Sequence, residues 1–276
     1  MSKLLDRYSS IFLTAILYII AIVYLFPIIW LLLSSLKPGS ELFSYPLNIF
    51  PENPTLDNFA YSWSTMDFMK YFFNTMVVAI VTTILTVLAS ASCGFALAKY
   101  RYKWLGVFFI CILATTMLPT EVIMNPTFTV ILNLGLHDSL AGLIIPSINT
   151  ATGVFMFRQY FLKVPNDLLE SARIDGASEG RIFFRIMLPI AKPVIITLSI
   201  FSFQWRWNDY IWPLIVLSDP DKFTVQIALR SIVGADYIDW VLLLSSSVIS
   251  LVPMIILFIV FQRYIMDPNA TAGLKG

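Results

Sequence analysis

The stretch from Glu170 to Pro189 is the most patterned group of charged side chains between the long apolar runs of the chain. Its carboxylates, on Glu170 and Asp175, and the guanidinium group of Arg181 suit salt bridges to another surface. The chain has one histidine, His137, which argues against a haem or multi-histidine metal site. Neither a catalytic residue nor a metal site is expected in this chain.

Capping residues predict that two short helices joined by a sharp bend position these charges. Asn166 suits the start of the first helix, and Gly176 can adopt the left-handed backbone that ends it. Ser178 can cap the second helix, which Pro189 is expected to end.

Apolar spacing gives each short helix a buried face. The expected buried residues are Leu168, Leu169 and Ala172 in the first helix and Ile182, Phe183 and Ile186 in the second. Arg181 and Arg185 share another face, while Glu170 and Arg173 are three residues apart and could form a weak pair. The simplest alternative for the whole stretch is an amphipathic loop helix that lies on a membrane surface.

Composition places the chain in a membrane. Of its 276 residues 58% are hydrophobic and 13% are charged, and the mean hydropathy is +0.79. A soluble domain does not have this balance. The net charge of +1 gives no sign of nucleic-acid binding, and the two cysteines are too few for a disulfide framework.

Apolar runs predict an all-α integral membrane protein with six transmembrane helices and one domain. The expected spans are residues 9–36, 71–98, 104–132, 139–158, 190–217 and 240–262. Loops of 37–70 and 218–239 lie on one side, and the loop of 159–189 lies on the other. The third run is interrupted near Pro119.

Basic residues orient the predicted spans. Lys37, Lys70, Arg206, Lys222 and Arg230 fall on the side of the two long loops, and the other thirteen of the 18 Lys and Arg residues fall on the side of the termini. The positive-inside rule therefore places both termini and residues 159–189 in the cytoplasm of a multi-pass cell-membrane protein.

Two groups of polar residues near the spans could line a path. Glu121 is costly against lipid, so with Asn125 it either lines such a path or sits at a helix break near Pro119. The second group comprises Trp205, Arg206, Trp207, Asn208 and Asp209. Its tryptophans fit an interfacial aromatic belt, and they would also suit stacking on a sugar ring.

The spacing of the charged stretch resembles the EAA loop of ABC-importer permeases. Glu170, Ser171 and Ala172 are followed at the family spacing by Gly176 and then by Ile186, Leu188 and Pro189; serine for the second alanine is the one departure. The resemblance implies a type I (MetI-like) importer fold and a coupling loop that docks on a separate ATPase. The coupling residues it implies are Glu170, Ser171, Ala172, Asp175, Gly176, Ala177, Arg181, Leu188 and Pro189.

Further resemblance is to the carbohydrate-importer branch, of the maltose type. Trp207-Asn208-Asp209 is similar to a motif of sugar-importer permeases, and the tail of 272–276 is similar to the Gly-rich tail of that branch. The loop of 218–239 corresponds to a scoop that contacts a binding protein, with Gly234, Ala235, Asp236 and Tyr237 at its tip.

The resemblance also implies a set of partners. They are a second, homologous permease that completes a heterodimer, an ATPase dimer, an extracellular solute-binding protein and an oligosaccharide, besides membrane lipid. The chain lacks the Gly-x-x-x-x-Gly-Lys-Ser/Thr loop that cradles phosphates, so ATP and magnesium are expected on the partner subunits.

Two other classes of protein compete with this interpretation. A secondary carrier or channel would need no ATPase, but buried charge is sparse here and the most patterned segment lies in a loop. A membrane enzyme is disfavoured by the single histidine and by the lack of a Gly-x-Ser-x-Gly elbow.

Overall fold

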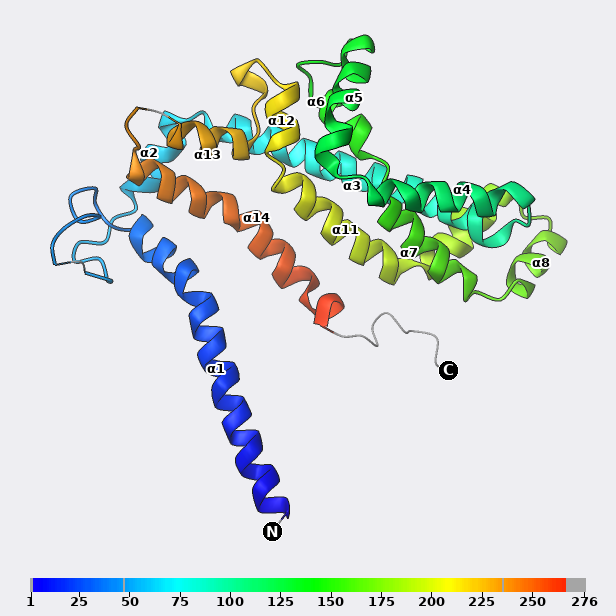
Figure 1. The fold of residues 1–276 in the computed structure, drawn as a ribbon, viewed down its shortest axis with the longest axis horizontal. Coiled ribbons are helices and arrows are strands. Elements are labelled where there is room, and N and C mark those ends of the chain that lie inside the picture. The colour runs from blue at the N-terminus through cyan, green and yellow to red at the C-terminus, as the bar shows by residue number, and fades with distance from the viewer. Residues whose placement is uncertain (1, 47, 235, 267–276) are drawn as a thin grey trace. The chain divides into compact units, whose positions relative to one another are not determined.

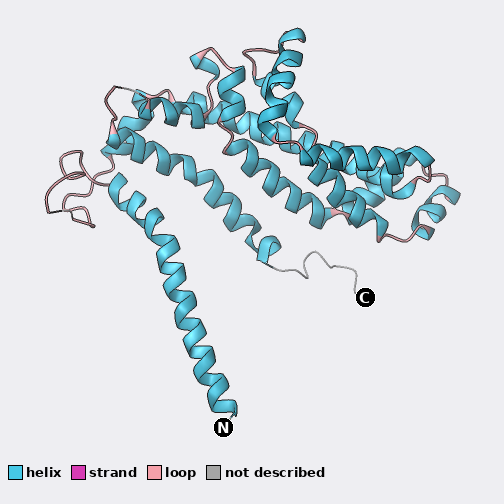
Figure 2. Ribbon diagram, viewed as in Figure 1, coloured by secondary structure: helices cyan, strands magenta, loops and turns pink. Residues whose placement is uncertain are grey.

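The structure, a computed structural model, describes residues 2–46, 48–234 and 236–266, and these residues form helices, turns and loops without a strand (Figure 2). Ala235 and residues 272–276, to which we gave roles above, lie outside the described residues. The chain divides into two units, residues 1–68 with 229–252 and residues 69–228 with 253–276.

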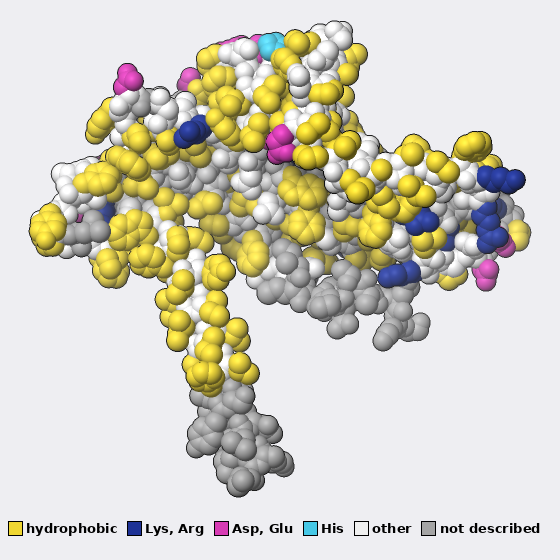
Figure 3. Space-filling view, in the orientation of Figure 1, with side chains coloured by type: hydrophobic (Ala, Val, Ile, Leu, Met, Phe, Trp, Pro, Cys, Tyr) yellow, Lys and Arg dark blue, Asp and Glu magenta, His cyan; other side chains and the backbone are white. Residues whose placement is uncertain are grey.

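Among the residues that the structure describes, three helices are long and apolar enough to cross a membrane. They are Phe12–Ser35 within α1 (Ser2–Ser35), α3 (Phe68–Lys99), and Trp240–Gln262 within α14 (Trp240–Met266). They cover the predicted spans 9–36, 71–98 and 240–262. The side chains of α1 from Phe12 to Phe26 are all exposed, which suits a helix surrounded by lipid or other spans. Figure 3 shows hydrophobic side chains along the visible face of this helix.

Three further membrane spans are present if each of three bent helix pairs is counted as one span. Lys103–Met117 and Thr120–Asn133 meet at 109°, Leu140–Ser147 and Ala151–Leu162 at 42°, and Glu179–Ile190 and Lys192–Trp207 at 78°. The first bend has a clear cause: Pro119 has no N–H to donate, and Leu118 before it is extended. The predicted span 190–217 is also divided, since one helix ends at Trp207 and the next begins at Ile211.

The remaining elements are short. They are α2 (Asp57–Thr65), α4 (Lys103–Ala114), η1 (Thr115–Met117), α5 (Thr120–Asn133), α6 (Leu140–Ile144), η2 (Ile145–Ser147), α7 (Ala151–Leu162), α8 (Asp167–Ile174), α9 (Glu179–Ile182), the π-helical η3 (Phe183–Met187), α10 (Leu188–Ile190), α11 (Lys192–Trp207), α12 (Ile211–Val216), η4 (Pro220–Lys222) and α13 (Val225–Val233) (Figure 1).

In the first unit, polar side chains tie the end of α1 to α2 and to the start of α14. The Asn58 amide donates to the carbonyl oxygens of Ser35 and Lys37, each at 2.8 Å. Tyr61 donates to the Asp239 carboxylate at 2.9 Å, and the hydroxyls of Ser62 and Ser245 are hydrogen-bonded to each other. These hydrogen bonds satisfy polar groups that would find no hydrogen-bond partner in lipid.

In the second unit, α3, α7 and α11 pack around one apolar core that extends under α8 and η3. Glycines allow the closest approaches. A Cβ on Gly94 of α3 would lie 2.6 Å from the Phe157 Cβ of α7, and one on Gly153 of α7 would lie 2.5 Å from the Ser90 Oγ. Small residues on α3 and α7 therefore allow these two helices to pack closely.

Asp138 connects the turn after α5 to the loop after α12. Its Oδ1 accepts from the backbone N–H groups of Ser218 and Asp219, and its Oδ2 lies 2.7 Å from the Lys222 Nζ. The ammonium of Lys222, and then the two N–H groups, hold the pKa of Asp138 well below its usual range. Its φ of +52° is one that aspartate tolerates better than most residues.

Candidate functional site

The bend predicted between Glu170 and Pro189 is present, and backbone hydrogen bonds define it. Helix α8 ends at Ile174, and Gly176 has a φ of +76°. The Ala177 N–H donates to the Ala172 carbonyl at 2.9 Å and the Gly176 N–H to the Arg173 carbonyl at 3.0 Å. This pair of bonds is the Schellman motif, which needs a left-handed residue at Gly176. We call residues 166–190 the elbow.

The second helix of the elbow starts and ends close to the predicted residues. The Ser178 side chain accepts from the Arg181 N–H and caps α9. The helical run Glu179–Ile190 ends one residue after Pro189, and the next helix leaves it at 78°. A π-helical turn, η3, lies between α9 and α10 and turns Met187 into the core, where it is fully buried.

Two smaller expectations for the elbow were wrong. Leu168 is 39% exposed while Leu169 is 2% exposed, so only the second leucine joins the core. The guanidinium of Arg173 pairs with Glu179 across the bend at 2.8 Å and not with Glu170. Asn166 stands at the N-cap position of α8, as predicted, but its side chain does not cap the helix; its Oδ1 accepts from the Lys99 Nζ at 3.0 Å.

Contacts of Asn166 and Glu179 fix the elbow to the turn between α3 and α4. The Tyr100 hydroxyl donates to the Glu179 Oε2 at 2.6 Å, and Lys99 also donates to the Val164 carbonyl. Leu169, Ile182 and Met187 pack in the same core as α3 and α7. The elbow is thus a rigid projection of the helix core, with a second attachment to α3.

The outer surface of the elbow is charged and partly apolar. Exposed there are Glu170, Ser171, Arg173, Ile174, Asp175, Gly176, Arg181, Phe184, Arg185 and Pro189. Ile174 is 86% exposed and Phe184 is 60% exposed. Of the other residues named for coupling, Ala172 is buried and Ala177 and Leu188 are half-buried. Figure 3 shows Lys and Arg side chains gathered at the end of the second unit that carries α8. A surface of this kind suits a protein partner.

Glu179→Gln is expected to weaken the elbow by less than about 1 kcal/mol at neutral pH, because the pair with Arg173 is exposed. Hydrogen bonds from Arg173 and then from Tyr100 lower the pKa of Glu179. A depressed pKa contributes stability above the unfolded value, and this contribution is lost as pH falls through the folded value. The difference in thermal midpoint between wild type and variant should therefore shrink below about pH 4. A difference as large at acidic as at neutral pH would contradict this assignment, and Glu170→Gln is the matched control.

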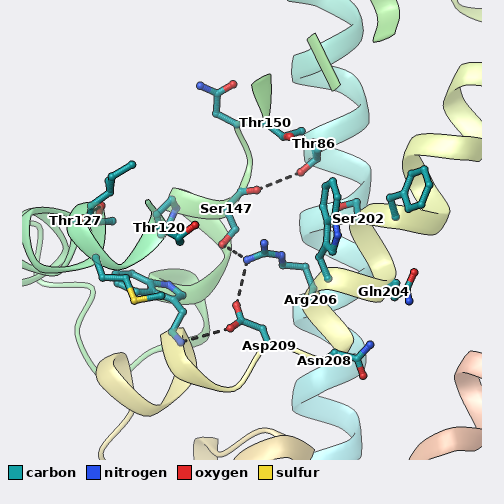
Figure 4. Close-up of a pocket in the computed structure, with 17 residues that line it drawn as sticks. Thr86, Thr120, Thr127, Ser147, Thr150, Ser202, Gln204, Arg206, Asn208 and Asp209 are labelled. Atoms are coloured by element: carbon teal, nitrogen blue, oxygen red, sulfur yellow. Dashed lines mark hydrogen bonds and ion pairs between the residues drawn. The ribbon is translucent and has the colours of Figure 1, made fainter. Parts of the chain in front are cut away.

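A cavity of about 820 Å³ lies in the second unit, between α3, α5, the break before α7, and the break between α11 and α12 (Figure 4). It is lined by hydroxyl, amide, aromatic and apolar side chains and by one ion pair. The lining residues are Thr86, Thr120, Ile123, Met124, Thr127, Pro146, Ser147, Asn149, Thr150, Phe201, Ser202, Gln204, Trp205, Arg206, Asn208, Asp209 and Trp212.

An ion pair crosses the break between α11 and α12. The Arg206 Nη1 lies 3.2 Å from the Asp209 Oδ2 and donates to the Ser147 Oγ at 2.8 Å. The Asp209 Oδ1 accepts from the Trp212 N–H at 3.4 Å. Figure 4 shows Arg206 between Ser147 and Asp209. The two paired residues are three apart in the sequence, and both line the cavity.

An aromatic pair forms another part of the wall. Phe201 and Trp205, four residues apart on α11, are stacked with ring centroids 6.0 Å apart, and each is 43% exposed. Flat exposed rings beside hydroxyl and amide groups suit a polar ligand with apolar faces.

The structure brings together part of the predicted path. Trp205, Arg206, Asn208 and Asp209 line the cavity. Trp207 does not, because it points to the other side of α11, where it is 1% exposed and packs on Phe72 and Phe203; its proposed place in the path is corrected here.

Glu121 and Asn125 are exposed and do not line this cavity; the face of α5 that does so carries Thr120, Met124 and Thr127. Sequence reasoning missed Thr86, Ser147 and these threonines. The available signal was the helical spacing of three and four between hydroxyl residues in apolar runs.

Gly234, Asp236 and Tyr237 are exposed, Tyr237 by 81%, near the end of α13. In the part of the chain that the structure describes, no group of three or more His, Cys, Asp or Glu residues could hold a metal ion.

Comparison with known proteins gives a consistent picture. Residues 90–267 match the model of a family described as "Binding-protein-dependent transport system inner membrane component". The chain is 41% identical over 249 residues to the arabinooligosaccharides transport system permease protein AraQ of Bacillus subtilis (strain 168), covering 89% of each protein. It is 33% identical over 231 residues to the sn-glycerol-3-phosphate transport system permease protein UgpE of Escherichia coli O1:K1 / APEC, covering 81% of this chain and 82% of that one.

Among solved structures, the fold matches a chain of a bacterial ABC transporter involved in the import of the acidic polysaccharide alginate. The TM-score is 0.86 at 24% identity, covering 94% of this chain and 97% of the other. At this level of identity the match establishes the fold.

Proposed function

We propose a substrate and a coupling mechanism for this chain, which belongs to the family of binding-protein-dependent transport system inner membrane components. It is a membrane-embedded permease subunit of an ATP-driven importer, with the fold of ABC-importer permeases. What the importer carries and how this subunit is driven are the proposal.

The proposed substrate is a sugar or short oligosaccharide that passes the cavity beside α11. The stacked face of Phe201 and Trp205 next to the amides of Gln204 and Asn208 is the observation that carries this assignment. Pyranose and furanose rings present apolar faces to aromatic rings and hydroxyls to amides. The name of the Bacillus subtilis relative, which refers to arabinooligosaccharides, supports the same class.

Trp205→Ala tests this substrate assignment. Removal of one stacking face is expected to raise the KM for uptake of radiolabelled arabinotriose by about tenfold, with the amount of subunit in the membrane unchanged. Trp63→Ala is the matched control, because Trp63 is also 43% exposed and also packs on one phenylalanine but does not line the cavity. Equal effects of the two substitutions, or no effect of Trp205→Ala, would count against a sugar contact here.

The proposed assembly comprises this chain, a second permease, two ATPase subunits and an extracellular solute-binding protein. ATP and magnesium would bind the ATPase subunits. The exposed face of the elbow, with Glu170, Asp175 and Arg181, would seat in a cleft of one ATPase subunit and move with it. Because Tyr100 and Lys99 attach the elbow to the α3–α4 turn, that motion would reach α3, which lines the cavity through Thr86.

The proposed orientation has both termini and the elbow in the cytoplasm, where ATP is available. The basic side chains near α8 support it through the positive-inside rule. Gly234, Asp236 and Tyr237 would then face the binding protein from outside.

A further inference from the structure

The charges around the cavity cancel. Of the residues that line it in the described chain, only Arg206 and Asp209 carry a charged side chain. The others present hydroxyls, amides, rings or aliphatic groups. Any charged substrate would therefore have to interact with this one pair.

The guanidinium group is already engaged by partners within the protein. Its Nη1 contacts the Asp209 carboxylate at 3.2 Å and the Ser147 hydroxyl at 2.8 Å. Asp209 is held in turn by the Trp212 N–H at the start of α12. The two side chains are 23% and 20% exposed, so solvent screens their charges less than it would screen those of a surface pair.

An anionic substrate would meet an unfavourable field in this arrangement. The Asp209 carboxylate lies 3.2 Å from the Arg206 Nη1, so an anion near the guanidinium would also lie near this negative group, and the repulsion would offset the attraction. A neutral sugar meets no such repulsion and can form hydrogen bonds with the amide and hydroxyl groups that line the cavity. Arg206 without a partner would suit a ligand with a phosphate or carboxylate group. The presence of Asp209 therefore favours neutral sugars over anionic ones.

We propose that Asp209 is a specificity-determining residue: it neutralises Arg206, so that the cavity accepts neutral oligosaccharides and disfavours sugars carrying a phosphate or carboxylate. This inference rests on the proposed function, the passage of a sugar through this cavity. The names of the proteins similar to this chain refer both to arabinooligosaccharides, which are neutral, and to sn-glycerol-3-phosphate, which is anionic.

The test measures binding to the complete importer in lipid nanodiscs, with the binding protein omitted so that its own selectivity does not contribute. The probes are arabinotriose and the same trisaccharide carrying one phosphate ester. The wild type should bind the neutral probe at least about tenfold more tightly than the anionic one. Asp209→Asn should reduce that ratio by about tenfold, since it frees the charge of Arg206.

Two further variants keep the result interpretable. Arg206→Gln combined with Asp209→Asn removes both charges and should restore the preference for the neutral probe. Asp57→Asn, an exposed aspartate far from the lining residues in sequence, controls for the loss of one negative charge and should leave the ratio unchanged.

The outcomes distinguish the two proposals. If arabinotriose binds but the wild type does not discriminate against the phosphate ester, or Asp209→Asn leaves the ratio within twofold of the wild type, the role of Asp209 is overturned and the sugar path stands. If neither probe binds, the sugar path itself is overturned, and the inference about Asp209 with it.

Discussion

Replacing Gly94 by alanine is expected to destabilise the folded subunit by about 1–3 kcal/mol, because the new methyl group would overlap the backbone of α7. An ideal Cβ at Gly94 lies 2.6 Å from the Phe157 Cβ and 2.9 Å from the Arg158 backbone nitrogen. Phe157 is fully buried, so neither helix can yield by moving a flexible side-chain end. The overlap is relieved only if α3 and α7 move apart, and this movement would open the core between them.

Gly106→Ala is the matched control for Gly94→Ala. Gly106 also lies in an apolar helix, α4, but a Cβ there meets nothing within 4 Å. Alanine exceeds glycine in helix propensity by about 0.8–1 kcal/mol, so this variant should be neutral or slightly stabilised. The measurement is the thermal midpoint of each detergent-solubilised variant and its yield of monodisperse protein. Equal midpoints for the two variants would show that α3 and α7 do not cross as closely as described.

Local spacing was enough to predict much of the elbow. Gly176 ends a helix and Ser178 caps the next because both effects act within five residues, whatever lies around them. The pair of Arg206 and Asp209 follows from the same kind of short-range geometry, three residues apart at the end of α11. Predictions of this type need no knowledge of the tertiary fold.

Contacts between distant segments could not be predicted in the same way. Glu170 is three residues from Arg173 and Glu179 is six, yet the left-handed turn at Gly176 brings Glu179 to the guanidinium. Ser147 reaches Arg206 from 59 residues away. Trp207 lies within a run of polar and aromatic residues, yet its direction on α11 takes it into the core. Each of these depends on how helices are placed, which periodicity alone does not give.

Gly176→Val is expected to abolish coupled transport while the subunit still inserts and assembles. A β-branched side chain disfavours the φ of +76° that the Schellman turn requires. A strain of about 1–3 kcal/mol lowers the population of the correct bend, relative to other conformations, by about five- to 150-fold. No atom lies within 4 Å of an added Cβ, so the effect would come from backbone strain and not from a clash inside the subunit.

Two matched variants isolate that cause. Gly180→Val adds the same bulk to the elbow at a position with open space and without a left-handed φ, so it should retain most transport. Gly176→Asn should recover much of the lost activity, because asparagine tolerates the left-handed region. The measurements are sugar uptake and the ATPase activity of the assembled importer, each normalised to the subunit in the membrane. If Gly180→Val and Gly176→Asn were as inactive as Gly176→Val, added bulk on the outer face would block docking whatever the conformation of the bend. If Gly176→Val were as active as the other two variants, the bend at Gly176 would have no part in coupling. The elbow would then not carry motion from the ATPase to the helices around the cavity.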